Sequence, residues 1–230
     1  VTYACACVAW LSMCPGLVVD LGGQPQMEAA VLDRFWFLRV AGSFEQADVT
    51  FAVAKSLLRG VGIVSPGQSV SLDMRLNRKR ASLRTNKGLA GKDLEAAIVL
   101  YSYTLELPPL FREVSKILND PNGRKNNSQD PVAQERIDAA IAWQNCVVRA
   151  MQHLKLSQPS CSVPPGTTGY RGMKYAYSRA YLADKFATGR YWPWYTLKSV
   201  SISKNLMSKP DFCGNSGPRT IFAIETFKGH

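Results

Sequence analysis

A short segment rich in serine and proline, residues 157–165, separates two parts of this chain that differ in hydropathy pattern. Proline has no backbone N–H group and restricts the residue before it, so such a segment ends regular secondary structure. Before the segment, apolar residues recur every three or four positions, as on one face of a helix. After it, short apolar runs are typical of strands. The pattern predicts an α+β protein with helices in residues 27–156 and a mostly β core from about residue 168.

Start and stop signals divide the helical part further. Ser43 is a predicted N-cap and Gly60 a predicted helix end, because serine caps helix N-termini and glycine ends helices. Ser65-Pro66-Gly67 is a turn signal between two short strand-like pieces. Pro131 fits the first turn of the last helix, and His153 is expected to cap the C-terminus of that helix. The predicted helices cover residues 27–41, 44–59, 88–104, 109–118 and 131–156.

The charge of the chain is unevenly distributed. The formal net charge is +11 over 230 residues, which favours acidic partners. Much of the excess lies between Arg75 and Lys92, which we interpret as a solvated, mobile basic connector. This stretch has no interleaved aromatic residues to stack on bases, so nucleic acid is not a convincing partner. Its cations are Arg75, Arg78, Lys79, Arg80, Arg84, Lys87 and Lys92.

Cysteine and histidine patterns predict no metal site. The six cysteines are scattered, and no Cys-x-x-Cys pair accompanies a histidine, so zinc is not expected and the redox compartment stays open. The apolar run from Val1 to Val19 contains Pro15 and Gly16 and lacks a basic lead-in, so it is not a convincing membrane span. Two interpretations stay open for this run: the remnant of a signal or anchor sequence, and a strand with a turn.

Three motifs after residue 168 carry side chains suited to phosphates and sugars. The first, Tyr170-Arg171-Gly172, offers a guanidinium group whose planar fork matches phosphate oxygens. The second, Ser199-Val200-Ser201, follows Trp194-Tyr195 closely and offers hydroxyl groups that bond sugar oxygens. The third is the strand-like Arg219-Thr220-Ile221-Phe222.

In this order the motifs resemble those of the arginine-specific mono-ADP-ribosyltransferases, which share an Arg, Ser, Glu signature. The resemblance implies a helical lobe followed by an ADP-ribosyltransferase-like, mostly β NAD-binding core, whose last strands are missing here. We therefore predict an N-terminal helical region with the basic connector over residues 1–87, a helical lobe over 88–157 and the incomplete β core over 158–230. The helical run adds matches at Ala96, Ala97, Ile98, Leu100, Tyr101, Tyr103, Thr104, Leu110 and Phe111.

The resemblance also implies an activity: transfer of ADP-ribose from NAD to an arginine side chain of an acceptor protein, with release of nicotinamide. Arg171 would hold phosphate and ribose oxygens of NAD, and Ser199 would bond the nicotinamide ribose, so these two are the expected catalytic residues. Gly172 would approach the nicotinamide amide closely, because glycine has no Cβ, and Ser201 would brace its own segment. The expected NAD-binding residues are Tyr170, Arg171, Gly172, Ser199, Ser201 and Phe212, with no metal.

The sequence departs from the family pattern at two points. No Glu-x-Glu follows the third motif, although such a carboxylate would stabilise the positive charge that develops on the ribose. The carboxylates after Ser201 are Asp211 and Glu225, and Glu225 comes too early in the order to serve. Lys198 stands where the family has a small residue, and it either crowds the pocket or points to solvent. The alternative function is a catalytically inactive NAD-binding or protein-binding protein; a basic protein that binds nucleic acid is the least favoured.

Overall fold

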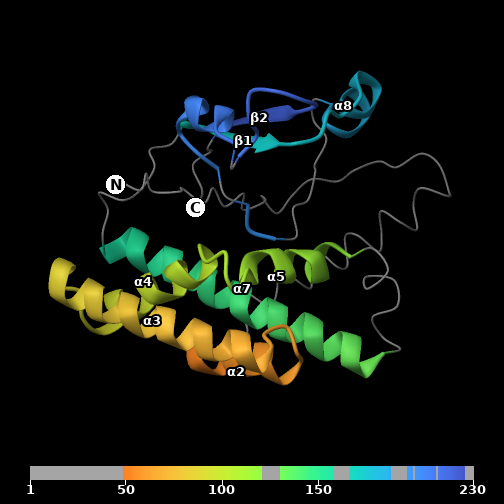
Figure 1. Ribbon diagram of the computed structural model, residues 1–230. Coiled ribbons are helices and arrows are strands. Elements are labelled where there is room, and N and C mark those ends of the chain that lie inside the picture. The colour runs from red at the N-terminus through yellow and green to blue at the C-terminus, as the bar shows by residue number, and fades with distance from the viewer. Residues whose placement is uncertain are drawn as a thin grey trace. The chain divides into compact units, whose positions relative to one another are not determined.

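A computed structural model describes residues 49–120, 130–157, 166–187, 196–198, 200–210 and 212–225 (Figure 1). The chain divides into two compact units. One, the helical unit, is formed by Asp20–Cys161, and the other, the sheet unit, by Val1–Val19 together with Ser162–His230.

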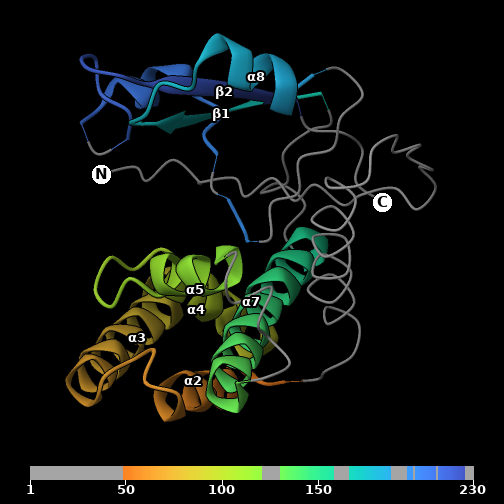
Figure 2. The same cartoon turned by 90° about the vertical axis from the view of Figure 1, so that its right-hand side faces the viewer.

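In the helical unit the longest helix, α7 (Pro131–Ser157), occupies the centre. Every residue from Ala139 to Val148 is buried, so the middle of this helix is enclosed on all sides. Figure 2 shows shorter helices grouped around it. These are α2 (Phe51–Gly60), α4 (Gly91–Tyr103) and α5 (Leu110–Asn119), while α3 (Pro66–Lys87) packs against α4.

Trp143 is the largest side chain of this core and is 1% exposed. Its ring stacks with Tyr103 at 6.1 Å between centroids, and its Nε1 donates to Ser102 Oγ at 3.3 Å. Ser102 Oγ in turn donates to the carbonyl oxygen of Val99 at 2.6 Å. A buried polar group without a hydrogen bond costs about 1–3 kcal/mol, so this chain of bonds allows an indole N–H to be buried between α4 and α7.

The basic stretch forms most of one continuous helix, α3. Gln68 N donates to Ser65 Oγ at 3.4 Å and Ser65 N donates to Gln68 Oε1 at 3.0 Å, a capping box that starts the helix at Pro66. The helix ends at Gly88, whose φ of +63° suits a residue without Cβ. The strand-like pieces predicted around Pro66 and the mobile connector predicted after them are therefore both wrong.

Ion pairs fix α3 to its two neighbours. Asp73 accepts a hydrogen bond from Lys55 Nζ at 2.7 Å and also pairs with Arg59, both on α2. Burial opposes ionisation of Asp73, but the hydrogen bonds from these two cations hold its pKa below its ordinary value. Arg80 makes a two-pronged pair with Glu95 on α4, with 2.8 Å between Nη2 and Oε2. Charge pairing therefore orients a helix that buries few apolar residues of its own.

The three helices predicted over residues 88–104, 109–118 and 131–156 are confirmed by α4, α5 and α7. The helix predicted over residues 27–41 lies outside the described residues, as does the predicted cap at Ser43.

Two helix ends refine the predictions. The end at Gly60 is confirmed, but α2 begins after Thr50, whose Oγ1 accepts a hydrogen bond from Val53 N at 3.3 Å. His153 serves a different purpose from the predicted C-cap. Its Nε2 lies 2.7 Å from Asp93 Oδ1, so it joins α7 to the first turn of α4.

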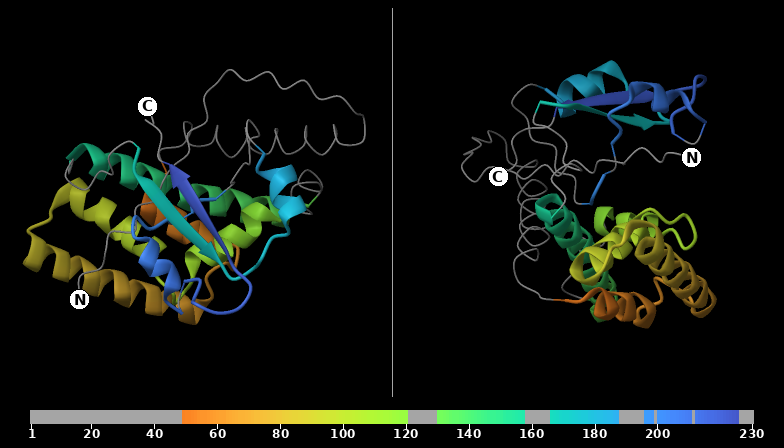
Figure 3. Two further views of the ribbon diagram at one scale, coloured as in Figure 1. Left: turned by 90° about the horizontal axis from the view of Figure 1, so that it is seen from above. Right: turned by 90° about the vertical axis from the view of Figure 1, so that its left-hand side faces the viewer.

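In the sheet unit, β1 (Thr168–Met173) and β2 (Thr220–Glu225) form an antiparallel pair. Figure 3 shows the two strands side by side and pointing in opposite directions. Helix α8 (Arg179–Lys185) follows β1, and the 3-10 helix η2 (Lys204–Ser208) comes before β2.

The prediction of a mostly β core is wrong. The described part of the chain is 63% helical, with six α-helices and one two-stranded sheet. The second motif contributes one isolated bridge, between Ser201 and Tyr170, rather than a strand. After this bridge the chain turns into η2, and in the turn Ser201 Oγ accepts a hydrogen bond from Ser203 N at 3.0 Å. Helix α3 formed where strand-like pieces and a connector were expected, and within the expected β core the chain forms α8 and η2 as well as the two strands. The division at residues 87 and 157 stays a prediction.

Among the described helices, none combines the length and the hydropathy that a membrane span requires.

Replacing the exposed Ala81 in the middle of α3 by proline distinguishes a folded helix from a mobile connector. Proline removes a helical hydrogen bond and clashes with the preceding turn, so Ala81→Pro should lower the free energy of unfolding by about 3 kcal/mol. Ala81→Gly is the matched control and should cost about 1 kcal/mol. Denaturant unfolding measures both. Equal stability of the wild type and the proline variant would contradict the helix.

Candidate functional site

Two of the three motifs are joined by backbone hydrogen bonds. Tyr170 N donates to Ser201 O at 2.6 Å, and Ser201 N donates to Tyr170 O at 2.9 Å. On its other edge β1 pairs with β2, so that Tyr170 lies opposite Ala223. The strand carrying Tyr-Arg-Gly thus lies between the end of Ser-x-Ser and the strand that contains Thr-Ile-Phe.

Alternation along β1 places its side chains on two faces, since neighbouring strand residues point to opposite sides. Arg171 and its partner Phe222 share one face. Val200 belongs to the same face, because its Cγ2 would lie only 2.9 Å from a Cβ added to Gly169. Ser201, paired with Tyr170, belongs to the opposite face, so the arginine and this serine do not project to the same side.

Aromatic rings cover Phe222 on the Arg171 face. Phe222 lies 5.1 Å from Phe186 and 6.2 Å from Tyr177, measured between ring centroids. Tyr177 stacks on Tyr181 of α8 at 5.0 Å, and α8 lies against the two strands (Figure 2). Ser178 caps this helix, with its Oγ accepting from Tyr181 N at 3.1 Å. The short helix therefore gives the arginine face a largely aromatic cover.

Arg171 has a second cation for a neighbour. Lys198 Nζ donates to Oγ1 of the buried Thr196 at 2.5 Å. Burial, together with the positive charge of Arg171, lowers the pKa of Lys198 to about 8. Phosphate oxygens are suitable acceptors for guanidinium and ammonium groups of this kind. Of the two interpretations of Lys198, the side chain directed to solvent does not agree with this burial.

The other face of β1 packs against the segment that leads into β2. A Cβ added to Gly172 would lie 2.5 Å from Cys213 Cβ and 3.2 Å from Met207 Sδ. Cys213 itself is buried and its backbone N–H donates to the carbonyl oxygen of Met207 at 3.1 Å. The close approach expected at Gly172 is therefore made by the protein's own side chains.

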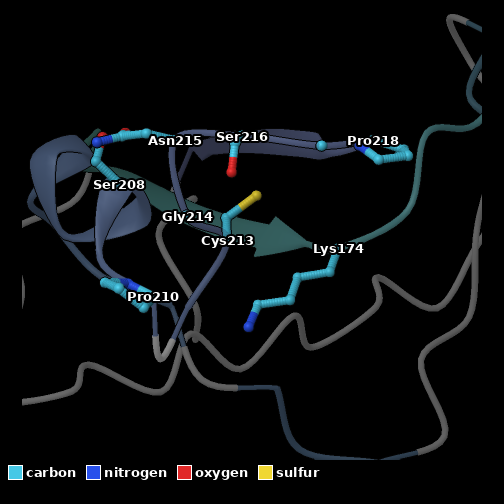
Figure 4. A pocket seen from close by; sticks show the side chains of 9 residues that line it. Lys174, Ser208, Pro210, Cys213, Gly214, Asn215, Ser216 and Pro218 are labelled. Carbon is cyan, nitrogen blue, oxygen red and sulfur yellow. The ribbon is translucent and has the colours of Figure 1, made fainter.

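An open hollow of about 530 Å³ lies beside this packing (Figure 4). In Figure 4, Lys174 extends from the end of β1 along one side, and Ser216 points inward from the loop before β2. The hollow is open to solvent, and glycine and proline residues line it together with polar side chains. Its lining consists of Lys174, Ser208, Pro210, Cys213, Gly214, Asn215, Ser216, Gly217 and Pro218.

The structure thus brings together Tyr170, Arg171, Gly172 and Ser201 of the predicted site. Ser199 lies outside the described residues, so its predicted role stays a prediction. The structure also describes three further residues that the sequence analysis singled out. Phe212 is 46% exposed in the turn after η2, and Ser201 Oγ donates to Ser203 O at 3.2 Å, a local brace. Glu225 ends β2 opposite Thr168.

Sequence reasoning missed the packing of Met207 and Cys213 on β1. A glycine inside a strand is a signal for close approach of another segment, and Gly172 carried that signal. Sequence reasoning also missed Thr196, whose Oγ1 accepts the hydrogen bond from Lys198 Nζ. No sequence signal could have identified this contact, because it depends on the burial of Lys198. Among the described residues, no group of three or more His, Cys, Asp and Glu side chains is placed to hold a metal ion.

Comparisons of the chain with protein-family models, with curated proteins and with solved structures found no match.

The contact at Gly172 predicts a coupled pair of substitutions. Gly172→Ala places a methyl group against Cys213 Cβ and should lower the free energy of unfolding of the sheet unit by about 1–3 kcal/mol. Cys213→Gly removes the opposing carbon, so the double variant should be more stable than the sum of the two single effects allows. A double-mutant cycle by thermal unfolding measures this coupling. Additive effects would show that the two residues do not touch.

The lowered pKa of Lys198 predicts a pH-dependent stability. The folded protein holds this proton less tightly than the unfolded chain, so stability should rise as the pH increases from about 8 towards 10.5, where both states become neutral. The gain has an upper limit of about 3 kcal/mol. Lys198→Met should abolish this rise and stabilise the protein near neutral pH, whereas Lys209→Met, at an exposed lysine, should retain it. Denaturant unfolding across this pH range measures the effect; an identical rise in both variants would contradict it.

Proposed function

We propose that this protein is an NAD-dependent protein-arginine ADP-ribosyltransferase. It would transfer ADP-ribose from NAD to an arginine side chain of an acceptor protein and release nicotinamide. The observation that supports this most directly is the pair of hydrogen bonds between Tyr170 and Ser201, which joins the Tyr-Arg-Gly and Ser-x-Ser motifs edge to edge. The proposal rests on this juxtaposition and on the order of the motifs, and it does not require a mostly β core.

The chemistry divides among the residues as follows. Arg171 binds the diphosphate of NAD through its guanidinium fork, and the neighbouring Lys198 adds a second positive charge. Ser199 bonds the nicotinamide ribose, and Ser201 braces the turn into η2. The bond between the ribose C1′ and the nicotinamide nitrogen breaks, and nicotinamide leaves with the electron pair. An arginine nitrogen of the acceptor then bonds to C1′ and loses a proton to solvent.

A protein that binds NAD or another protein without turnover is the second candidate. Two carboxylates follow Ser201, and neither belongs to a Glu-x-Glu. Glu225, at the end of β2, is held in register with Thr168, next to the first motif in the sheet but too early in the family order. Positive charge that develops on the ribose needs an anionic partner, and without one the rate falls by orders of magnitude.

Calorimetric titration with NAD tests the binding half of the proposal. Arg171→Ala should weaken NAD binding at least about tenfold, equivalent to about 1.4 kcal/mol, because the phosphates lose a charged, forked donor. Arg179→Ala, at an exposed arginine of the same unit, is the matched control and should bind as the wild type does. Absence of NAD binding in the wild type would overturn the proposal.

Release of nicotinamide in the presence of NAD and an arginine-containing peptide then separates the two candidates. Release that requires the peptide and disappears with Arg171→Ala identifies a transferase. Tight NAD binding without release identifies the non-catalytic alternative.

A further inference from the structure

The strongest feature outside the proposed site is the exposed side of α3. A helix of 22 residues is about 33 Å long, and this one is held as a rigid rod by its capping box and its ion pairs. Residues three and four positions apart lie on the same side of a helix. The exposed residues Arg75, Arg78, Ser82 and Thr85 follow this spacing and form one stripe.

The cations of α3 fall into two groups with different partners. Arg80 pairs with Glu95, and Lys79 lies 5.2 Å from the ring centroid of Tyr101, so these two attach the helix to α4. The other group is exposed and makes no ion pair within the described part of the chain. Its members are Arg75, Arg78, Arg84 and Lys87.

Negative charge on the helix is confined to one residue. Asp73 is the single carboxylate of α3, and Lys55 and Arg59 of α2 already occupy it. The exposed cations of α3 are therefore not neutralised by their own helix. Such a surface attracts a polyanion.

The neighbouring side chains indicate which polyanion fits. Phosphate backbones are contacted by arginine and lysine together with the hydroxyl and amide groups of Ser, Thr and Asn. Ser82, Thr85 and Asn86 provide these groups between the cations, and the Nδ2 of Asn86 donates to Ser82 Oγ at 3.2 Å. The helix has no aromatic residue, so it cannot stack on the bases of single strands.

A lipid surface fits less well. Helices that lie in a membrane interface bury a continuous apolar face rich in large side chains. The large apolar side chains exposed on α3 are Val70 and Met74, both near its N-terminal end, and the remainder of the exposed side is polar or basic.

We propose that α3 binds the phosphate backbone of double-stranded nucleic acid through its exposed cations. Arg75 and Arg78 share one side of α3 with the hydroxyl groups of Ser82 and Thr85, whereas Arg84 and Lys87 lie on a different side near its C-terminal end. Cations and hydroxyl groups of this kind contact the phosphates of a duplex without reading its sequence. This surface is independent of the NAD function. The sequence argued against nucleic acid because the basic stretch lacks aromatic residues, which contacts with the phosphate backbone of a duplex do not require.

Fluorescence anisotropy with labelled DNA and RNA duplexes tests the proposal on the whole chain. The variant to compare replaces the exposed cations of α3: Arg75→Gln, Arg78→Gln, Arg84→Gln and Lys87→Gln. The matched control removes the same charge from exposed positions elsewhere in the helical unit: Arg112→Gln, Lys116→Gln, Arg136→Gln and Lys155→Gln. Circular dichroism and thermal unfolding establish that both variants retain the helical fold.

The wild type and the control should bind duplexes with an affinity that falls steeply as salt increases. The α3 variant should bind at least about tenfold more weakly at low salt. Its slope of log affinity against log salt should be smaller by up to about 3.6, because up to four phosphate contacts are lost at about 0.9 per contact. Comparison of the DNA and RNA duplexes shows which helix form is preferred.

Three results would overturn the proposal. One is the absence of duplex binding by the wild type. Another is an equal loss of affinity in the control, which would trace binding to net charge rather than to α3. The third is binding to vesicles of phosphatidylcholine and phosphatidylserine without binding to duplexes, which would assign the surface to a membrane.

Discussion

The helical unit depends on the enclosure of α7. Its middle is buried on every side. The large indole of Trp143 fits there because Ser102 Oγ of α4 accepts a hydrogen bond from its Nε1 and itself donates to the carbonyl oxygen of Val99. Burying one large aromatic side chain is worth about 1.5–3 kcal/mol, which an unsatisfied N–H would largely cancel. The packing of Trp143 against α4 therefore depends on the hydrogen bond from its Nε1 to Ser102 Oγ. Helix α3 buries few apolar side chains, and ion pairs with α2 and α4 hold it in position.

The sheet unit depends on a different constraint, the absence of side chains at two positions of β1. Gly169 and Gly172 face opposite sides, and each leaves room for another segment: Val200 on one side, and Met207 with Cys213 on the other. The second motif can therefore reach the edge of β1, and the loop after η2 can close beneath it. A two-stranded sheet is marginal in isolation, so these contacts, together with the aromatic cover from α8, supply much of its packing.

The sequence was sufficient for the elements whose signals are local, and insufficient where a distant contact decides. The apolar spacing and flanking prolines of α4, α5 and α7 identified each helix. The start of α3 was also encoded locally, since Ser65 and Gln68 form a capping box with proline at the first helical position, but the Pro-Gly pair was interpreted as a turn. The pairing of Tyr170 with Ser201 and the burial of Lys198 arise from segments far apart in sequence, which no local pattern determines. The expected β core failed for this reason: strand-like runs form a sheet only where partners pair with them.

The net charge of +11 serves two different physical purposes in this chain. On α3, Arg75, Arg78, Arg84 and Lys87 are exposed, so their attraction for anions is screened within about 8 Å at physiological salt. Lys198 is partly removed from water, and burial, with a smaller contribution from the positive charge of Arg171, lowers its pKa to about 8. A pair of partly buried cations gains most binding free energy from a compact, doubly charged ligand that contacts both at once. A row of exposed cations gains most from a polymer that contacts many cations in turn. The same sign of charge therefore acts differently in the two settings, because the field of a cation is stronger where water is partly excluded than where water surrounds it.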